Sequence, residues 1–177
     1  MEPEHAYRFC PSCATPLARL VKDEDGGPKE RLRCPACGFT HWDNPVPVLA
    51  AIVELEGKVL LARNAAWKAP FFALITGFME AGETPEEGIV REVAEETGLA
   101  VESLSLVGVH EFIKKNQVII TYHARASGQV TLSPELVEYK LLAPDKVLCW
   151  PSGTGFALAQ WLRTCGLEPQ FMELPKL

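Results

Sequence analysis

Three glutamates, Glu92, Glu95 and Glu96, are spaced so that their carboxylates project from one face of a helix. Like charges at this spacing repel each other, so the cluster lowers helix stability unless a cation lies among them. Mg²⁺ is commonly held by a few carboxylates together with water and substrate phosphates. The spacing therefore indicates a divalent-cation site that polarises a phosphorus centre and activates a bound water. An ordinary solvated acidic helix face is the alternative.

A second group with metal chemistry consists of two Cys-x-x-Cys pairs, Cys10 with Cys13 and Cys34 with Cys37. Each pair can wrap a tight turn around one ion, and two such turns complete a tetrahedral shell of four thiolates. Four protein ligands leave no open position, so we expect a structural Zn²⁺ that does not touch substrate. A reduced or redox-active dithiol is the alternative.

The acidic cluster needs a helix, and residues 84–97 are predicted to form one. Thr84 is a suitable N-cap, Pro85 occupies the first helical position, and Glu87 completes a capping box. Gly98 provides the left-handed residue at which the helix ends. These signals place the three carboxylates in the last two turns.

The loop before this helix contains Gly77 and Gly82, which allow a sharp bend. Glu83 precedes Arg91 by about two helical turns. If the loop folds inward, this pair can join loop to helix and fix the geometry of the acidic cluster.

The rest of the chain divides by composition into a metal module, residues 1–44, and a mixed α/β domain, residues 45–177. Residues 22–29 are polar and glycine-containing, as at a hairpin tip. The second region has β-rich runs and helical spacing near its end. The expected strands are 46–55, 58–62, 101–112, 117–126 and 139–142, with a further apolar run at 71–75 and a helix at 155–164.

Residues 77–99 resemble the Nudix box, the pattern G-x5-E-x7-R-E-U-x-E-E-x-G-U in which U is aliphatic, and every specified position is met. The resemblance implies an α/β/α sandwich with a mixed sheet. It also implies Mg²⁺ or Mn²⁺ held mainly by Glu92 and Glu96, with Glu95 assisting, and hydrolysis of a nucleoside diphosphate linked to another moiety. The matching residues are Gly77, Glu83, Arg91, Glu92, Val93, Glu95, Glu96, Gly98 and Leu99.

The cysteine module and this pattern together resemble the zinc-ribbon Nudix enzymes, such as NADH, FAD and ADP-ribose pyrophosphatases. This resemblance implies a further acidic residue beyond the box, with Glu135 the first choice and Glu138 the second; an ordinary surface glutamate is the alternative. It also suggests a homodimer. The S-Q-P-W-P-F-P motif of NADH pyrophosphatases is replaced by residues 108–114, which favours FAD, ADP-ribose or a similar dinucleotide over NADH.

Candidate substrate contacts are less strongly indicated. Arg63 ends an expected strand and could meet a phosphate, although a surface arginine is the simpler interpretation. Trp67, Phe71, Phe72 and Phe112 could stack on a base or flavin ring, but such residues more often belong to a core. From this group we select Phe72 and Phe112 as substrate-binding candidates.

Composition limits the partners. The formal net charge of −6 disfavours nucleic acid, since affinity for phosphates comes largely from Lys and Arg. No run is apolar enough for a membrane helix, and residues 1–9 lack a secretory h-region, so we expect a cytoplasmic protein acting on a small-molecule nucleotide. A non-catalytic nucleotide sensor and an enzyme acting on nucleotide-capped RNA are the alternatives. The complete set of carboxylates argues against the sensor.

Overall fold

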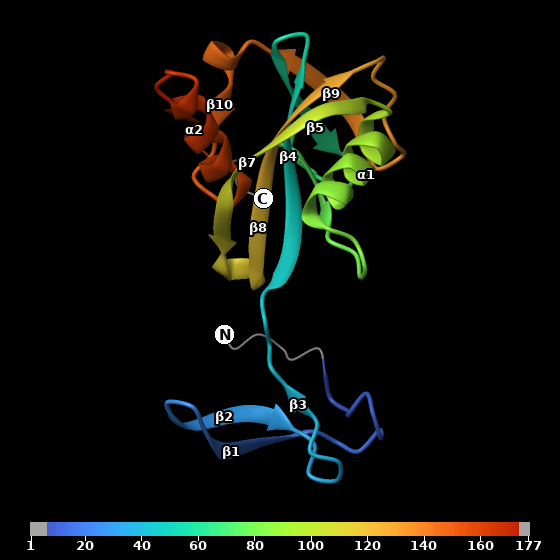
Figure 1. Cartoon of the computed structure of the whole chain (residues 1–177), viewed down its shortest axis with the longest axis vertical. Helices are drawn as coiled ribbons and strands as arrows, with labels where there is room; N and C mark the ends of the chain where they lie inside the picture. The colour runs from blue at the N-terminus through green and yellow to red at the C-terminus, as the bar shows by residue number, and fades with distance from the viewer. Residues whose placement is uncertain (1–6, 174–177) are drawn as a thin grey trace. The chain divides into compact units, whose positions relative to one another are not determined.

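The computed structural model describes residues 7–173, and the chain divides into two units, Met1–Asn44 and Pro45–Leu177 (Figure 1). Each is described by itself. The assignment of zinc binding to the first and catalysis to the second stays a prediction.

The first unit is a small antiparallel sheet in the order β1-β2-β3, formed by Ala18–Glu24, Gly27–Arg33 and Thr40–His41. The predicted hairpin tip is narrower than residues 22–29, because both strands continue until only Asp25 and Gly26 remain in the turn. Among its described residues, the buried apolar side chains are Cys10 and Cys34. A module with so small a core needs a staple such as a metal ion.

The second unit is built on a six-stranded mixed sheet in the order β7-β8-β4-β5-β9, with β6 also paired to β4. β4 and β8 run parallel, and the other pairs in this sheet are antiparallel. The strands are β4 (Val46–Leu55), β5 (Lys58–Asn64), β6 (Ile75–Phe78), β7 (Ala100–Phe112), β8 (Gln117–Ser127) and β9 (Leu136–Leu142).

One helix covers each face of this sheet (Figure 1). Side chains alternate along β4, so Leu49 and Val53 pack with α1 (Pro85–Thr97), whereas Ile52 packs with α2 (Thr154–Thr164). This confirms the predicted α/β/α sandwich. The remaining short elements are η1 (Ile113–Lys115), η2 (Pro144–Lys146), β10 (Leu148–Cys149) and β11 (Gln170–Phe171).

Local signals placed α1 well. Thr84 Oγ1 accepts from Glu87 N at 3.2 Å, Glu87 Oε2 accepts from Thr84 N at 2.8 Å, and Gly98 is left-handed with φ 70°. The predicted capping box is therefore confirmed. Of the helices in the described part of the chain, none combines the length and apolarity needed to span a bilayer.

The apolar run 71–75 is not a strand over its length. Its residues mostly form loop, with an isolated bridge between Ala73 and Ala62, and the strand begins only at Ile75. The physical reason is that β6 pairs with the first half of β4, Val48 to Ala51, whereas β5 occupies the second half from Val53. Residues 71–74 therefore cross between two pairing segments.

Candidate active site and cysteine cluster

The predicted ion pair between Glu83 and Arg91 is present. Arg91 Nε donates to Glu83 Oε2 at 3.0 Å, and Nη2 donates to Glu83 Oε1 at 2.9 Å. The Glu80 amide also donates to Glu83, and the guanidinium together with this amide lowers the pKa of the Glu83 carboxyl. Arg91 Nη2 reaches the Phe78 carbonyl at 3.2 Å, so this cation joins the glycine-containing loop to α1.

Gly77 lies in β6 and not in the loop as predicted, and a glycine is required there because this strand closely approaches Glu92. A Cβ at position 77 would lie 1.9 Å from Glu92 Cδ and Oε1, which is far inside van der Waals contact. On its other side the Glu92 carboxylate accepts from Arg91 Nη1 at 2.7 Å. Glu92 is thus held between a bare backbone and a guanidinium, and only 12% of its side chain is exposed.

Five glutamates line one cavity of about 510 Å³: Glu92, Glu95 and Glu96 from α1, Glu80 from the loop before α1, and Glu135 from the loop before β9. Two backbone bonds dock this loop against the end of α1: Ser133 N donates to Glu96 O at 3.0 Å and Thr131 N to Thr97 O at 2.8 Å. The structure therefore brings the four predicted acidic residues together.

The electrostatics of this cavity are strongly negative. Burial, together with the charges of Glu92, Glu135 and Glu95, raises the pKa of Glu96 to about 7. Among the described residues that line the cavity, Arg91 is the only basic one. Its donors are engaged with Glu83, Glu92 and Glu95. Such a donor set fits a hard divalent cation and repels an unaccompanied anion.

Arg63 and Glu138 lie elsewhere. Arg63 on β5 places Nε 3.5 Å from Glu138 Oε2 on β9, where the two strands are paired. Neither is among the described residues that line the carboxylate cavity. Of the two acidic candidates beyond the box, only Glu135 therefore faces Glu96.

A second cavity, of about 320 Å³, adjoins the first. Phe112 lines it together with Trp67, Phe71 and Trp150. Phe72 is not among the described residues lining either cavity; instead its ring lies 4.0 Å from Lys140 Nζ.

Three residues, Val48, Thr76 and Gln117, line both cavities. Sequence reasoning did not select them, nor Glu80 and Trp150, which line one cavity each. Val48 and Thr76 lie on the paired strands β4 and β6, and Gln117 starts β8, parallel to β4. No local pattern signals a residue that matters through strand pairing of this kind.

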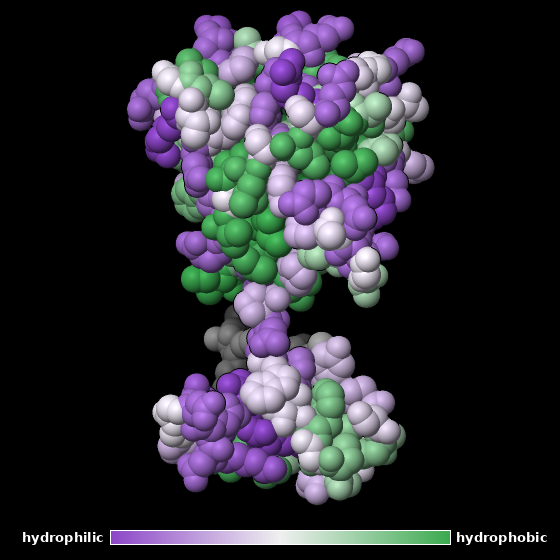
Figure 2. Space-filling model, in the orientation of Figure 1, coloured by the Kyte–Doolittle hydropathy of each residue, from purple (hydrophilic) through white to green (hydrophobic). Residues whose placement is uncertain are grey.

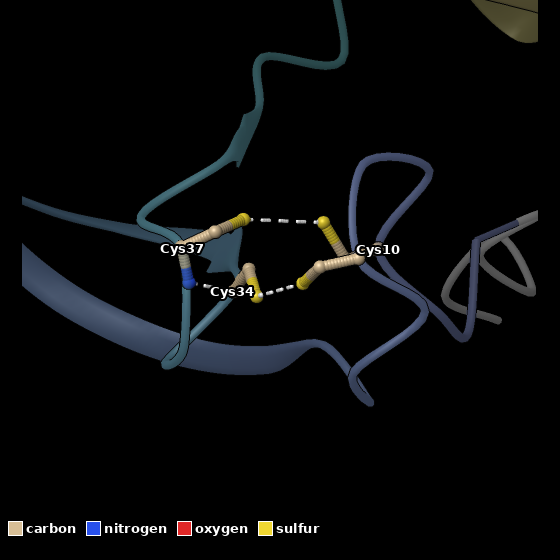
Figure 3. A group of neighbouring side chains, drawn as sticks. Cys10, Cys34 and Cys37 are labelled. Carbon is tan, nitrogen blue, oxygen red and sulfur yellow. Dashed lines mark hydrogen bonds between the residues drawn. The ribbon is translucent and has the colours of Figure 1, made fainter.

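The four cysteines converge in the first unit, as predicted (Figure 3). Their Sγ atoms all lie within 4.8 Å of one another, with Cys10–Cys37 at 3.5 Å and Cys13–Cys34 at 3.4 Å. A tetrahedral zinc–thiolate shell requires sulfur–sulfur distances of about 3.8 Å. Backbone amides of Ser12 and Cys37 approach the sulfurs of Cys10 and Cys34 at 3.4 Å. The cluster therefore fits Zn²⁺.

Comparisons with known proteins agree with this geometry. Residues 43–164 match the family model described as NUDIX domain, and residues 8–43 match the one described as Nudix N-terminal, a zinc ribbon. A crystal structure of a NUDIX hydrolase from Nitrosomonas europaea is 27% identical with a TM-score of 0.72, covering 94% of this chain and 97% of that one.

Two curated relatives are each called NAD-capped RNA hydrolase NudC. The one from Chromobacterium violaceum is 37% identical over 70% of this chain and 44% of its own length. The one from Stutzerimonas stutzeri is 27% identical over 75% of this chain and 46% of its own length. The chain thus spans less than half the length of these relatives.

Proposed function

Because the chain belongs to the Nudix family, we propose that it is a hydrolase that cleaves the diphosphate of a nucleoside diphosphate linked to another moiety. The observation that carries this proposal is the single cavity that Glu92, Glu95, Glu96 and Glu135 line together. In a merely solvated acidic face, Glu96 would not be partly buried and no carboxylate from a separate loop would line the same cavity.

Glu92 and Glu96 are the proposed principal ligands of Mg²⁺ or Mn²⁺. Glu92 is already positioned by Gly77 and Arg91, and Glu96 is partly buried beside three other carboxylates, which raises its pKa. When bound, the cation neutralises the diphosphate and lowers the pKa of water. Binding also offsets the repulsion that raises the Glu96 pKa, so metal and carboxylate cluster stabilise each other.

The protein's own groups then have distinct roles. Glu95 is 62% exposed and Glu135 lies at the loop side, so both are placed to complete the cation's shell and to accept the proton that an attacking water loses. The oxygen of that water bonds to phosphorus as the anhydride P–O bond breaks. Arg91 holds the loop and Glu92 in place throughout.

The cysteine cluster is proposed to hold a structural Zn²⁺ through Cys10, Cys13, Cys34 and Cys37. The ion would replace the apolar core that the first unit lacks. Formation of a homodimer and a cytoplasmic location stay predictions, as do substrate-binding roles for Arg63 and Phe72.

The proposed substrates are dinucleotides such as FAD, ADP-ribose or NADH. A second candidate is a nucleotide-capped RNA end, because the curated relatives are called NAD-capped RNA hydrolases. The net charge of −6 favours the small molecule. Purified protein should be incubated with FAD, ADP-ribose, NADH and NAD-capped RNA, each with Mg²⁺ or Mn²⁺, and the products identified by mass.

Two mononucleotide-type products from a dinucleotide would support the proposal. The Glu96→Gln variant is the control for contaminating activity. Binding of every nucleotide without turnover would instead identify a sensor, and cleavage of capped RNA alone, with affinity falling steeply as salt rises, would identify the RNA enzyme.

A further inference from the structure

Glu135 is held by both of its backbone polar groups, although the residue itself is exposed. Its N–H donates to Ser133 Oγ at 3.3 Å, and its carbonyl accepts from Ala65 N at 2.8 Å. Because Ser133 N also donates to Glu96 O, the loop is tied to α1 on one side and to the end of β5 on the other. Ala65 directly follows β5, and no described residue of β5 itself lines the carboxylate cavity.

The N–H of Ala65 is presented to Glu135 by a turn that begins at Asn64. Asn64 Oδ1 accepts from Ala66 N at 2.8 Å, and Asn64 O accepts from Trp67 N at 3.2 Å. An asparagine side chain that bonds the backbone two residues on stabilises the start of a turn in this way. These two bonds leave the N–H of Ala65 to donate outside the turn. The Asn64 side chain therefore sets the direction of the donor that holds Glu135.

The turn lies at the point where the pairing of β5 with β9 ends. The last pair is Asn64 with Leu136, after a register shift that follows Arg63. β9 is the terminal strand of the described sheet, with β5 as its partner. The bond from Ala65 N extends this pairing by one step to Glu135, and so fixes the loop where the regular strand has already ended.

Electrostatic repulsion favours withdrawal of Glu135 from the cavity. The carboxylates of Glu92, Glu95 and Glu96 line the same cavity and carry the same charge. On the face shown in Figure 2, the side chains over α1 are mostly hydrophilic. Without a cation, the α1 carboxylates therefore push the Glu135 loop away from the helix. Backbone bonds that hold the loop in place against this repulsion prepare the ligand set in advance and should strengthen cation binding.

We infer that Asn64 is a positioning residue for the proposed cation site: its turn directs Ala65 N to the Glu135 carbonyl and so keeps the Glu135 carboxylate at the cavity. The inference rests on the proposed function for the identity of the site. It goes further by giving the end of β5 a part in metal affinity, through a residue that is not among the described residues lining the carboxylate cavity.

Mn²⁺ binding to the full chain without substrate can be measured by electron paramagnetic resonance, so the test does not depend on turnover. Asn64→Ala removes the acceptor that forms the turn, and Mn²⁺ affinity should fall about fivefold, the size expected for one lost hydrogen bond. Asn64→Asp keeps an oxygen acceptor at this position and should restore most of the affinity. Asn44→Ala is the matched control, because Asn44 is an exposed asparagine of the first unit, and it should leave affinity unchanged.

Ala65→Pro tests the bond to Glu135 while sparing the turn. Proline is favoured at the second position of a β-turn, but it lacks the N–H that the Glu135 carbonyl accepts. It should weaken Mn²⁺ binding about as much as Asn64→Ala does. In a Glu135→Gln background neither change should lower affinity further, because the carboxylate that they position has been removed. Thermal unfolding midpoints should stay close to those of the parent proteins, since the turn is exposed.

Unchanged Mn²⁺ affinity in folded Asn64→Ala or in folded Ala65→Pro would overturn the inference. Losses of the same size in the Glu135→Gln background would overturn it too, because the effect would not pass through Glu135. In either case, dinucleotide cleavage by the wild-type protein would leave the proposed function standing. If the expected losses occur but no diphosphate is cleaved, the positioning role stands and the proposed function fails. If wild type binds Mn²⁺ no better than Glu96→Gln, the cation site itself fails, and the inference fails with it.

Discussion

The cysteine cluster and the carboxylate cavity differ in donor chemistry and in openness. The four sulfurs lie within 4.8 Å of one another. Among residues 7–173, no other group of three or more potential metal ligands is this compact. The carboxylates instead line a cavity of about 510 Å³, with Glu95 62% exposed. The sulfurs leave room for one ion alone, whereas the carboxylates border open space.

This difference would let one chain hold the two proposed metals at separate sites. A closed thiolate shell satisfies Zn²⁺ and has no position for water or substrate. An open oxygen site suits a hard cation that keeps waters and shares the phosphates of its ligand. The first metal should therefore govern stability and the second turnover, so a substitution at one site should leave the property governed by the other site unchanged.

The largest expected effect is on turnover, from Glu96→Gln. The amide keeps the size of the side chain but removes a charge from the ligand set. Because metal stabilisation of the reacting phosphate contributes several kcal/mol, kcat should fall about 1000-fold or more. Zinc content, measured by mass spectrometry, and the thermal unfolding midpoint should stay close to wild type. Unchanged turnover would show that the carboxylate cavity is not the catalytic centre.

Gly77→Ala should have the next largest effect, although it removes no ligand. The added Cβ would lie 1.9 Å from the Glu92 carboxylate, which must move. A displacement of about 1 Å at a reacting centre can cost about 100-fold in kcat, and steady-state kinetics across Mg²⁺ concentrations would measure it. Gly57→Ala is the control for the added methyl group, because nothing lies within 4 Å of a Cβ at Gly57, although its φ of 73°, unlike the backbone at Gly77, strains an alanine. Equal losses in both variants would show that the clash with Glu92 is not the cause.

Glu135→Gln and Glu138→Gln form a matched pair with a smaller expected difference. Glu135 lines the carboxylate cavity, whereas Glu138 pairs with Arg63 on the sheet. We expect Glu135→Gln to lower kcat or Mg²⁺ affinity about tenfold or more and Glu138→Gln to change neither. The reverse outcome would mean that the loop moves when the cation binds.

The contrast between these two glutamates also shows where sequence reasoning ends. The capping box at Thr84 and the pair of Glu83 with Arg91 depend on residues within one loop and helix, so their spacing predicted them. The choice of Glu135 depends on the bond from Ser133 N to Glu96 O, which docks one loop on a distant helix. No spacing rule encodes that contact.

The cavity lined by Phe112 and Trp150 was harder still to predict. Phe112 was a candidate, but Gln117 and Trp150 were not, because their importance comes from tertiary packing. The parallel pairing of β4 with β8 places Gln117 opposite Val46. A parallel partner lies far away in sequence, so local patterns predicted the two strands but not their pairing.

Cys34→Ser should have the smallest effect on turnover and should alter stability instead. Cys34 is 2% exposed and contributes one of the four sulfurs, so its loss opens the zinc shell in a unit with little apolar core. We expect bound zinc to fall and the first unit to unfold at a lower temperature, as measured by metal analysis and calorimetry. The sheet and both helices of the second unit have their own cores, so kcat of the folded fraction should stay near wild type.

Cys165→Ser is the control, since Cys165 is exposed and lies outside the cluster, and it should leave zinc content and stability unchanged. If folded Cys34→Ser protein lost as much kcat as Glu96→Gln, the cysteine cluster would take part in catalysis, and the two sites would not have separate roles.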